Sequence, residues 1–158
     1  MMPIAAPIHD AAELTRFIEA EYHQRHRVQL PRLVEMADRV ETVHAGSEGL
    51  PAGLSAILRR MLEDMDGHMM KEEMILFPAM RAGGGPGIGA PIAVMRADHD
   101  DHGREIDEIR LLTGNLSAPA GACGTWRALY AGLAEFVDDL TEHMRLENEV
   151  LFPQFEGK

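Results

Sequence analysis

The sequence predicts an all-α protein, an antiparallel up-down bundle of four helices. Apolar side chains recur at alternating steps of three and four residues in four segments. Three stretches rich in Gly, Pro and Ser separate these segments, at 45–53, 81–91 and 113–124. Alternating β-branched runs between Asn-Gly or Asp-Gly turns do not occur. The 158 residues suit one domain spanning 1–158, and the short connections favour antiparallel neighbours.

The first predicted hairpin spans about 10–80. Its first helix runs from Asp10, an expected N-cap, to about His44, with Pro31 as an expected kink. Its second helix covers about 51–78 and ends near a proline. The inward-facing positions are His23, His26, Leu30, Leu33, Ala37 and Val40 in the first helix, and Leu54, Leu58, Met61, Met65, His68, Glu72 and Leu76 in the second.

The second predicted hairpin spans about 91–153. Its first helix covers about 91–112, and its second begins near Thr125, an expected N-cap, and ends at Phe152 before Pro153. The inward-facing positions are Ile92, Met95, His99, His102, Ile106 and Ile109, followed in the last helix by Leu129, Leu133, Phe136, Leu140, His143, Glu147 and Val150. All four helices therefore carry titratable groups where a bundle normally has apolar ones.

The two hairpins also repeat each other in sequence. The segment HMMKEEMILFP at 68–78 aligns with HMRLENEVLFP at 143–153, which keeps His, Met, Glu, Leu, Phe and Pro in register. Upstream, HQRH at 23–26 matches HDDH at 99–102. The repeat predicts a pseudo-twofold axis, with one His helix and one His-plus-Glu helix from each hairpin. Two matching half-sites suggest a pair of metal ions.

Composition limits the classes of partner and compartment. The formal net charge of -11 and pI of about 5.1 argue against nucleic acid, because that class of partner requires clustered Lys and Arg. The single cysteine, Cys123, allows neither an internal disulfide nor a Cys-rich metal site. The sequence contains no apolar run long enough for a membrane span. We therefore expect a cytoplasmic protein with no nucleic-acid or membrane partner.

The buried carboxylates of the two repeated motifs need a common explanation. Burying a Glu without a partner costs several kcal/mol, and a cation between Glu72 and Glu147 removes that cost. Because residues four apart lie one turn apart, each His-x-x-x-Glu pair can face the same interior space. Nitrogen with bridging carboxylate suits iron or manganese. The predicted ligands of a dinuclear site are His23, His68, Glu72, His99, His143 and Glu147.

Three further histidines have less direct predicted roles. His26 and His102 are expected to hydrogen-bond behind the ligands, with direct coordination as the alternative. His44 lies 21 residues after His23, about 31 Å along a continuous helix. It reaches the metals only if the chain turns back after Pro31, and the helical register of the preceding residues favours a distant placement.

These motifs resemble the hemerythrin-like His-His-Glu cation-binding domains. The segments EYHQRHRVQLP, HMMKEEMILFP, ADHDDHG, CGTWRALY and HMRLENEVLFP are most similar to the repair-of-iron-centres proteins within that family. The resemblance implies a hemerythrin-like bundle with iron at the six predicted ligand positions, and it also implicates His44. Members usually begin with a small Cys-containing domain that this sequence lacks, so the chain is either a shorter relative or part of a longer protein.

The resemblance implies a non-haem di-iron protein of the nitrosative and oxidative stress response. Two irons bridged by carboxylates, with an oxo bridge, would leave an open position for a diatomic gas. We expect binding of nitric oxide, with its reduction and support of iron-sulfur cluster repair as extensions; the electron donor and enzyme status stay open. One alternative is an oxygen-binding or oxygen-sensing protein without catalysis. Another is a ferritin-like oxidase or peroxidase, although that bundle requires Glu-x-x-His helices and two further Glu.

Overall fold

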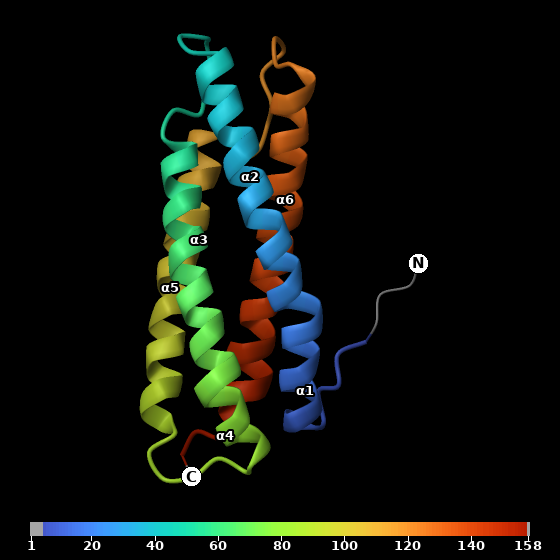
Figure 1. The fold of residues 1–158 in the computed structure, drawn as a ribbon, viewed down its shortest axis with the longest axis vertical. Helices are drawn as coiled ribbons and strands as arrows, with labels where there is room; N and C mark the ends of the chain where they lie inside the picture. Colours follow the sequence, from blue (N-terminus) through green and yellow to red (C-terminus); the bar gives the residue numbers. More distant parts are fainter. Residues whose placement is uncertain (1–4, 158) are drawn as a thin grey trace.

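The computed structural model describes residues 5–157, and every regular element within that range is helical. The chain runs up, down, up and down the long axis of a four-helix bundle (Figure 1), which confirms the predicted fold class. The predicted domain limits, residues 1 and 158, lie outside the described part. None of the described helices is both long and apolar enough to cross a membrane. The elements are α1 (Ala11–Phe17), η1 (Ile18–His23), α2 (Gln24–Val43), α3 (Leu54–Lys71), η2 (Glu72–Leu76), α4 (Phe77–Arg81), α5 (Gly89–Leu112), α6 (Gly124–Arg145), η3 (Leu146–Leu151) and η4 (Phe152–Gln154).

The first helix of the bundle is built from α1, η1 and α2 without interruption. Asp10 is its N-cap, as predicted, because its Oδ1 accepts a hydrogen bond from the Glu13 N–H at 3.1 Å. The helix continues through Pro31, which lies on the exposed face. There water can hydrate the carbonyl that the missing proline N–H leaves without a partner. The chain therefore does not turn back after Pro31.

Two predicted helix ends differ from the structure. The second helix continues to Arg81, past the end expected near Pro78, because α4 begins a new helical turn at Phe77 and its first turn tolerates a proline. The last helix begins at Gly124, and Cys123 is its N-cap residue without a side-chain capping bond. The predicted capping role of Thr125 was wrong, since that residue already lies inside the first turn of α6.

Three of the four bundle helices contain a π-helical segment, which we call a wide turn. At the end of each wide turn a backbone N–H bonds to the carbonyl five residues earlier: Gln24 to Glu19, Phe77 to Glu72, and Phe152 to Glu147. The wider turn shifts the helical register by one residue. The side chain buried after Glu147 is therefore Leu151, whereas the predicted Val150 is only half-buried.

A polar layer divides the interior into two apolar clusters. The larger cluster fills the bundle from Leu30 to Val40 on α2 and includes Trp126 and Phe136 of α6. The smaller cluster lies at the end where α1 and α4 meet, and includes Phe77 and Phe152. Between them, buried His and Glu side chains replace the apolar ones. The wide turns lie at this layer and at its border with the smaller cluster.

Candidate metal centre

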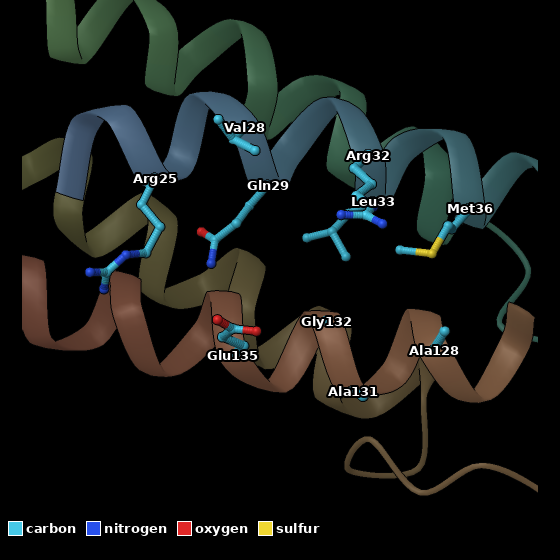
Figure 2. A pocket seen from close by; sticks show the side chains of 10 residues that line it. All are labelled: Arg25, Val28, Gln29, Arg32, Leu33, Met36, Ala128, Ala131, Gly132 and Glu135. Atoms are coloured by element: carbon cyan, nitrogen blue, oxygen red, sulfur yellow. The ribbon is translucent and has the colours of Figure 1, made fainter. Parts of the chain in front are cut away.

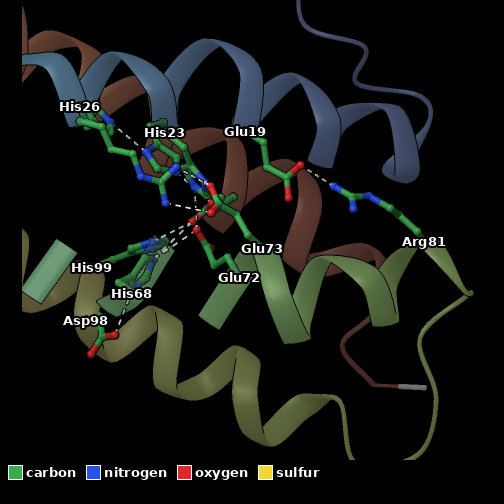
Figure 3. Close-up of polar contacts among 12 residues, drawn as sticks. Glu19, His23, His26, His68, Glu72, Glu73, Arg81, Asp98 and His99 are labelled. Carbon is green, nitrogen blue, oxygen red and sulfur yellow. Dashed lines mark hydrogen bonds and ion pairs between the residues drawn. The ribbon is translucent and has the colours of Figure 1, made fainter. Parts of the chain in front are cut away.

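The structure brings together all six side chains that the sequence predicted as ligands. Figure 3 labels four of them, His23, His68, Glu72 and His99. They form two groups of four donors, and the donor atoms in each group lie within 4.8 Å of one another. Both glutamates belong to both groups, and all six residues are buried. We call the two groups the inner position (His23, Glu72, His143, Glu147) and the groove position (His68, Glu72, His99, Glu147).

Short nitrogen–oxygen distances define each position. In the inner position, His23 Nε2 is 3.0 Å from Glu72 Oε1, and His143 Nε2 is 2.9 Å from Glu147 Oε2. In the groove position, His99 Nε2 is 2.8 Å from Glu147 Oε1, and His68 Nε2 is 3.5 Å from Glu72 Oε1. Each glutamate therefore faces one His of each position, as a carboxylate bridge between two ions requires.

Several donor atoms at the centre have no hydrogen-bond partner. Glu72 Oε2, Glu147 Oε1, His68 Nε2 and His99 Nε2 are all buried without a well-aligned hydrogen bond within residues 5–157, although His99 Nε2 and Glu147 Oε1 lie only 2.8 Å apart. A buried polar atom without a partner costs about 1–3 kcal/mol, so four such atoms in one place need an explanation. Two shared cations would accept their lone pairs. Imidazole nitrogen with bridging carboxylate suits iron, and the residues fit a di-iron centre.

The titration behaviour of the centre shows how strongly it attracts positive charge. Burial opposes the charged form of the His68 imidazole, but Glu72 and Glu147 outweigh burial and raise its pKa to about 11. Burial likewise opposes ionisation of Glu147, yet His143, His68 and His99 hold the pKa of that carboxyl well below its usual range. The two buried glutamates therefore favour positive charge at the places where cations would lie.

The ring nitrogens that face away from the centre are also paired. His23 Nδ1 lies 2.7 Å from Glu73 Oε2, and His99 Nδ1 lies 2.7 Å from Asn148 Oδ1. Both Nη atoms of Arg27 donate to the Glu73 carboxylate, at 2.7 and 2.8 Å. Because each Nδ1–H has an acceptor, the Nε2 lone pair of each ring is directed to the metal position.

The other two ligand rings are oriented in the same way. His68 Nδ1 lies 3.0 Å from Asp98 Oδ2, and His143 Nδ1 lies 3.0 Å from His26 Nε2. Burial, reinforced by the charge of His143, lowers the pKa of His26 to about 3. His26 is therefore neutral and can accept the hydrogen bond of the His143 ring. The structure places it behind a ligand, outside both groups of donors.

The remaining two predicted histidines lie in different surroundings. His102 is beside the groove position, with its ring 5.6 Å from that of His68 and its Nδ1 3.4 Å from Glu105 Oε1. His44 follows the last turn of α2, where its Nε2 lies 3.1 Å from Cys123 Sγ. The resemblance implicated His44 in the centre, but the structure does not bring it there. The unbroken helix separates it from the ligands by about 31 Å.

Sequence reasoning predicted His26 behind the ligands but missed the other three residues that orient the ligand rings. Glu73 and Asn148 each follow a bridging glutamate directly, and Asp98 directly precedes His99. The signal that could have found them is their position, because a polar residue next to a ligand often contacts the neighbouring ligand across the helix interface.

Two grooves border the groove position. One, of about 350 Å³, lies between α3 and α5 and is lined by His68, His102 and Asp98 among others. The second, of about 450 Å³, lies between α5 and α6 and includes His99. A larger groove of about 540 Å³ lies between α2 and α6 (Figure 2), and neither it nor the other two includes a ligand of the inner position.

Known proteins with similar sequences share most of this chain. An iron-sulfur cluster repair protein YtfE from Edwardsiella ictaluri is 53% identical over 145 residues, which cover 92% of this chain and 66% of the relative. The protein of that name from Musicola paradisiaca is 50% identical over 150 residues, covering 95% of this chain and 66% of the relative. The one from Yersinia pseudotuberculosis is 51% identical over 141 residues, covering 89% and 64%. The chain thus spans about two thirds of the length of these relatives.

A family description matches the part of the chain that contains the centre. The sequence profile of the hemerythrin HHE cation binding domain matches residues 17–155, which include all six buried donors. The profile, the up-down helical bundle and the paired His and Glu donors agree in both position and chemistry. The chain therefore belongs to the hemerythrin HHE cation-binding domain family.

Proposed function

We propose that this protein holds two irons, one in the inner position and one in the groove position, with Glu72 and Glu147 as bridges. The observation that carries the assignment is that both glutamates belong to both groups of donors. The four histidines would supply two nitrogens to each iron. Such a pair of irons supplies redox-active centres with coordination positions left for a small ligand.

We further propose that the ligand is a diatomic gas, with nitric oxide as the first choice. Two features of the site support this proposal, the grooves beside the centre and the small space that the side chains leave for a ligand. The grooves approach the centre as far as His68 and His99, while Phe77 and Phe152 stack on His23 and His99 at 5.8 and 5.9 Å. These apolar rings exclude water from one side of the polar layer. Only a small molecule can occupy a space bounded by so many fixed side chains.

The names of the relatives support a role in iron-sulfur cluster repair, which we place in the response to nitrosative and oxidative stress. The role in their name, iron-sulfur cluster repair, is that of chains about 40% longer than this one. The relevant partners would be proteins with damaged clusters, together with an electron donor. The part of the chain described here would contribute the iron and its gas-binding position to that process.

The test begins with iron content. Protein reconstituted under anaerobic conditions should bind close to two irons per chain, and one or fewer would contradict the dinuclear assignment. The reduced protein should then change its visible and EPR spectra on addition of nitric oxide, with metal-free protein as the control. A spectral response to oxygen but none to nitric oxide would favour the oxygen-binding alternative. Restored activity of a dehydratase with a damaged [4Fe-4S] cluster would support the repair role.

A further inference from the structure

The two metal positions have closely matched surroundings because the hairpins repeat each other. His23 and His99 hold corresponding places, and each ring stacks on a phenylalanine. The ring centroids are 5.8 Å apart for His23 and Phe77, and 5.9 Å apart for His99 and Phe152. Each Nδ1 lies 2.7 Å from a side-chain oxygen. Each position therefore serves as an internal control for the other.

The oxygen that each Nδ1 meets differs in charge. His23 meets the carboxylate of Glu73, whereas His99 meets the uncharged amide of Asn148. The repeat aligns these two partners, because each directly follows a bridging glutamate. A carboxylate behind a metal-bound imidazole raises the basicity of the ring and strengthens its bond to the metal. An amide orients the ring equally well without adding charge.

We propose that Glu73 and Asn148 make the two metal positions unequal, so that the inner position retains its ion and the groove position loses its ion first. The inference rests on the proposed dinuclear centre and specifies how its two halves differ. Glu73 and Asn148 are positioning residues, since they act on the metal only through His23 and His99.

Asp98 places a carboxylate behind His68 of the groove position, whereas the inner ligand His143 is backed by the neutral His26. Each position therefore has one carboxylate behind a histidine, and the Asp98 carboxylate is held less firmly than that of Glu73. Two nitrogens of Arg27 fix the Glu73 carboxylate, at 2.7 and 2.8 Å. The Asp98 side chain is 33% exposed, compared with 24% for Glu73, and within residues 5–157 it pairs with His68 but with no Arg or Lys. Water competes for an exposed hydrogen bond. Asp98 therefore strengthens metal binding in the groove position less than Glu73 strengthens it in the inner position.

Access to solvent favours the same order of loss. The two grooves that border the centre are lined by His68 and by His99, the two histidines of the groove position, although the Nε2 atom of each ring is itself buried. The inner ligand His143 is instead covered by Tyr22 and His26, whose ring centroids lie 5.6 and 5.1 Å from its own. A chelator therefore meets the groove position before it meets the inner one.

The test uses Co²⁺, because the visible absorbance of the bound ion can be measured without any activity of the protein. Protein with two Co²⁺ per chain is mixed with excess EDTA, and the loss of absorbance is followed over time. The wild type should lose its two ions in two phases. The isosteric variants Glu73→Gln and Asn148→Asp each keep an oxygen for the histidine Nδ1–H and change the charge behind the ring. Glu73→Gln also loses one of the two Arg27 hydrogen bonds, because its amide nitrogen cannot accept. Arg96 Nη2 already donates to the main-chain carbonyl oxygen of Asn148 at 3.0 Å, so a side-chain carboxylate at this position would have a cation nearby.

Glu73→Gln should speed the slow phase about tenfold or more, the range typical of groups behind metal ligands. Asn148→Asp should slow the fast phase by a similar factor. The double variant should reverse the order of loss. His99→Ala, which impairs only the groove position, should keep one ion that leaves at the slow rate, and this identifies the retained ion. Unchanged thermal melting of the metal-free variants would separate a charge effect from misfolding.

Two ions lost in a single phase, with no response to either isosteric variant, would overturn the inference and leave the dinuclear centre intact. A fast phase that belongs to the inner position would also overturn it. Binding of fewer than two ions by the wild type would contradict the proposed function itself, so the two failures give different results.

Discussion

The polar layer and the larger apolar cluster are built on the same helices but depend on different forces. The apolar cluster buries side chains such as Leu129 and Leu133 completely, and that burial stabilises it without help from a ligand. The polar layer buries Glu72 and Glu147 equally completely, which is favourable only when protons or metal ions compensate their charge. The bundle therefore separates the residues that maintain the fold from those that hold the metals.

The largest effect should come from removing a bridge. Glu147→Ala or Glu72→Ala should lower the iron content of both positions, because each carboxylate belongs to both groups of donors. Iron analysis of the reconstituted variants measures this. Glu149→Ala is the matched control, since its side chain is 67% exposed and two residues away from Glu147. Loss of a single iron from a bridge variant would show that the carboxylate serves only one ion.

A substitution in the apolar cluster should have the opposite pattern. Leu129→Ala removes a side chain that is 0% exposed, and should lower the free energy of unfolding by about 2–5 kcal/mol. Below the melting temperature the variant should still bind two irons. Denaturant unfolding and iron analysis of one preparation provide both measurements, with Leu111→Ala, at an 83% exposed position, as the control. If Leu129→Ala lost iron while folded, the two regions would not be independent.

Removal of the metal should lower stability without unfolding the bundle. A ligand at one hundred times its Kd stabilises a protein by about 2.7 kcal/mol, which corresponds to a shift in Tm of about 5–10 °C for a chain of this size. Circular dichroism of the metal-free protein should keep its helical signal and show the lower Tm. A metal-free protein without helical signal would mean that the apolar clusters do not suffice for folding.

A smaller effect is expected from His26→Ala. The variant removes the acceptor of the His143 Nδ1 hydrogen bond but no predicted ligand. We expect an iron content near two and a modest loss of metal affinity, measured by competition with a chelator. Metal loss as severe as that of a bridge variant would place His26 among the direct ligands.

His44→Ala should have the least effect on the centre. His44 contacts Cys123 and lies next to Trp126 at the far end of α2, so two irons and an unchanged visible spectrum are expected. Thermal melting is the sensitive measurement, because the variant alters packing at that end of the bundle. A shifted charge-transfer band would indicate a link between His44 and the irons that the structure does not contain.

The sequence predicted the bundle and the meeting of the six donors because both depend on helical periodicity. It did not predict the wide turns, although the spacing contained a signal for them. His68, Glu72, Leu76 and Met80 are all buried and follow one another at steps of four. In an α-helix each such step rotates the stripe by about 40°, so three steps in succession cannot keep one face inward. The position of Glu73 and Asn148 next to the bridging glutamates was a signal, but which ligand each one contacts depends on how far apart the helices lie.

The wide turns also make the centre depend on the number of residues in the chain, as well as on their identity. Each contains one residue more than an α-helical turn needs. Deleting one residue between Ile18 and His23 would restore an ordinary helix and leave α2 and its apolar contacts intact. The same deletion would rotate α1 by about 100° relative to His23. Either His23 would then leave the centre, or the side chains of α1 would leave the smaller apolar cluster. A single-codon insertion or deletion could thus create or abolish such a centre in a helical bundle, while every ligand residue stays unchanged.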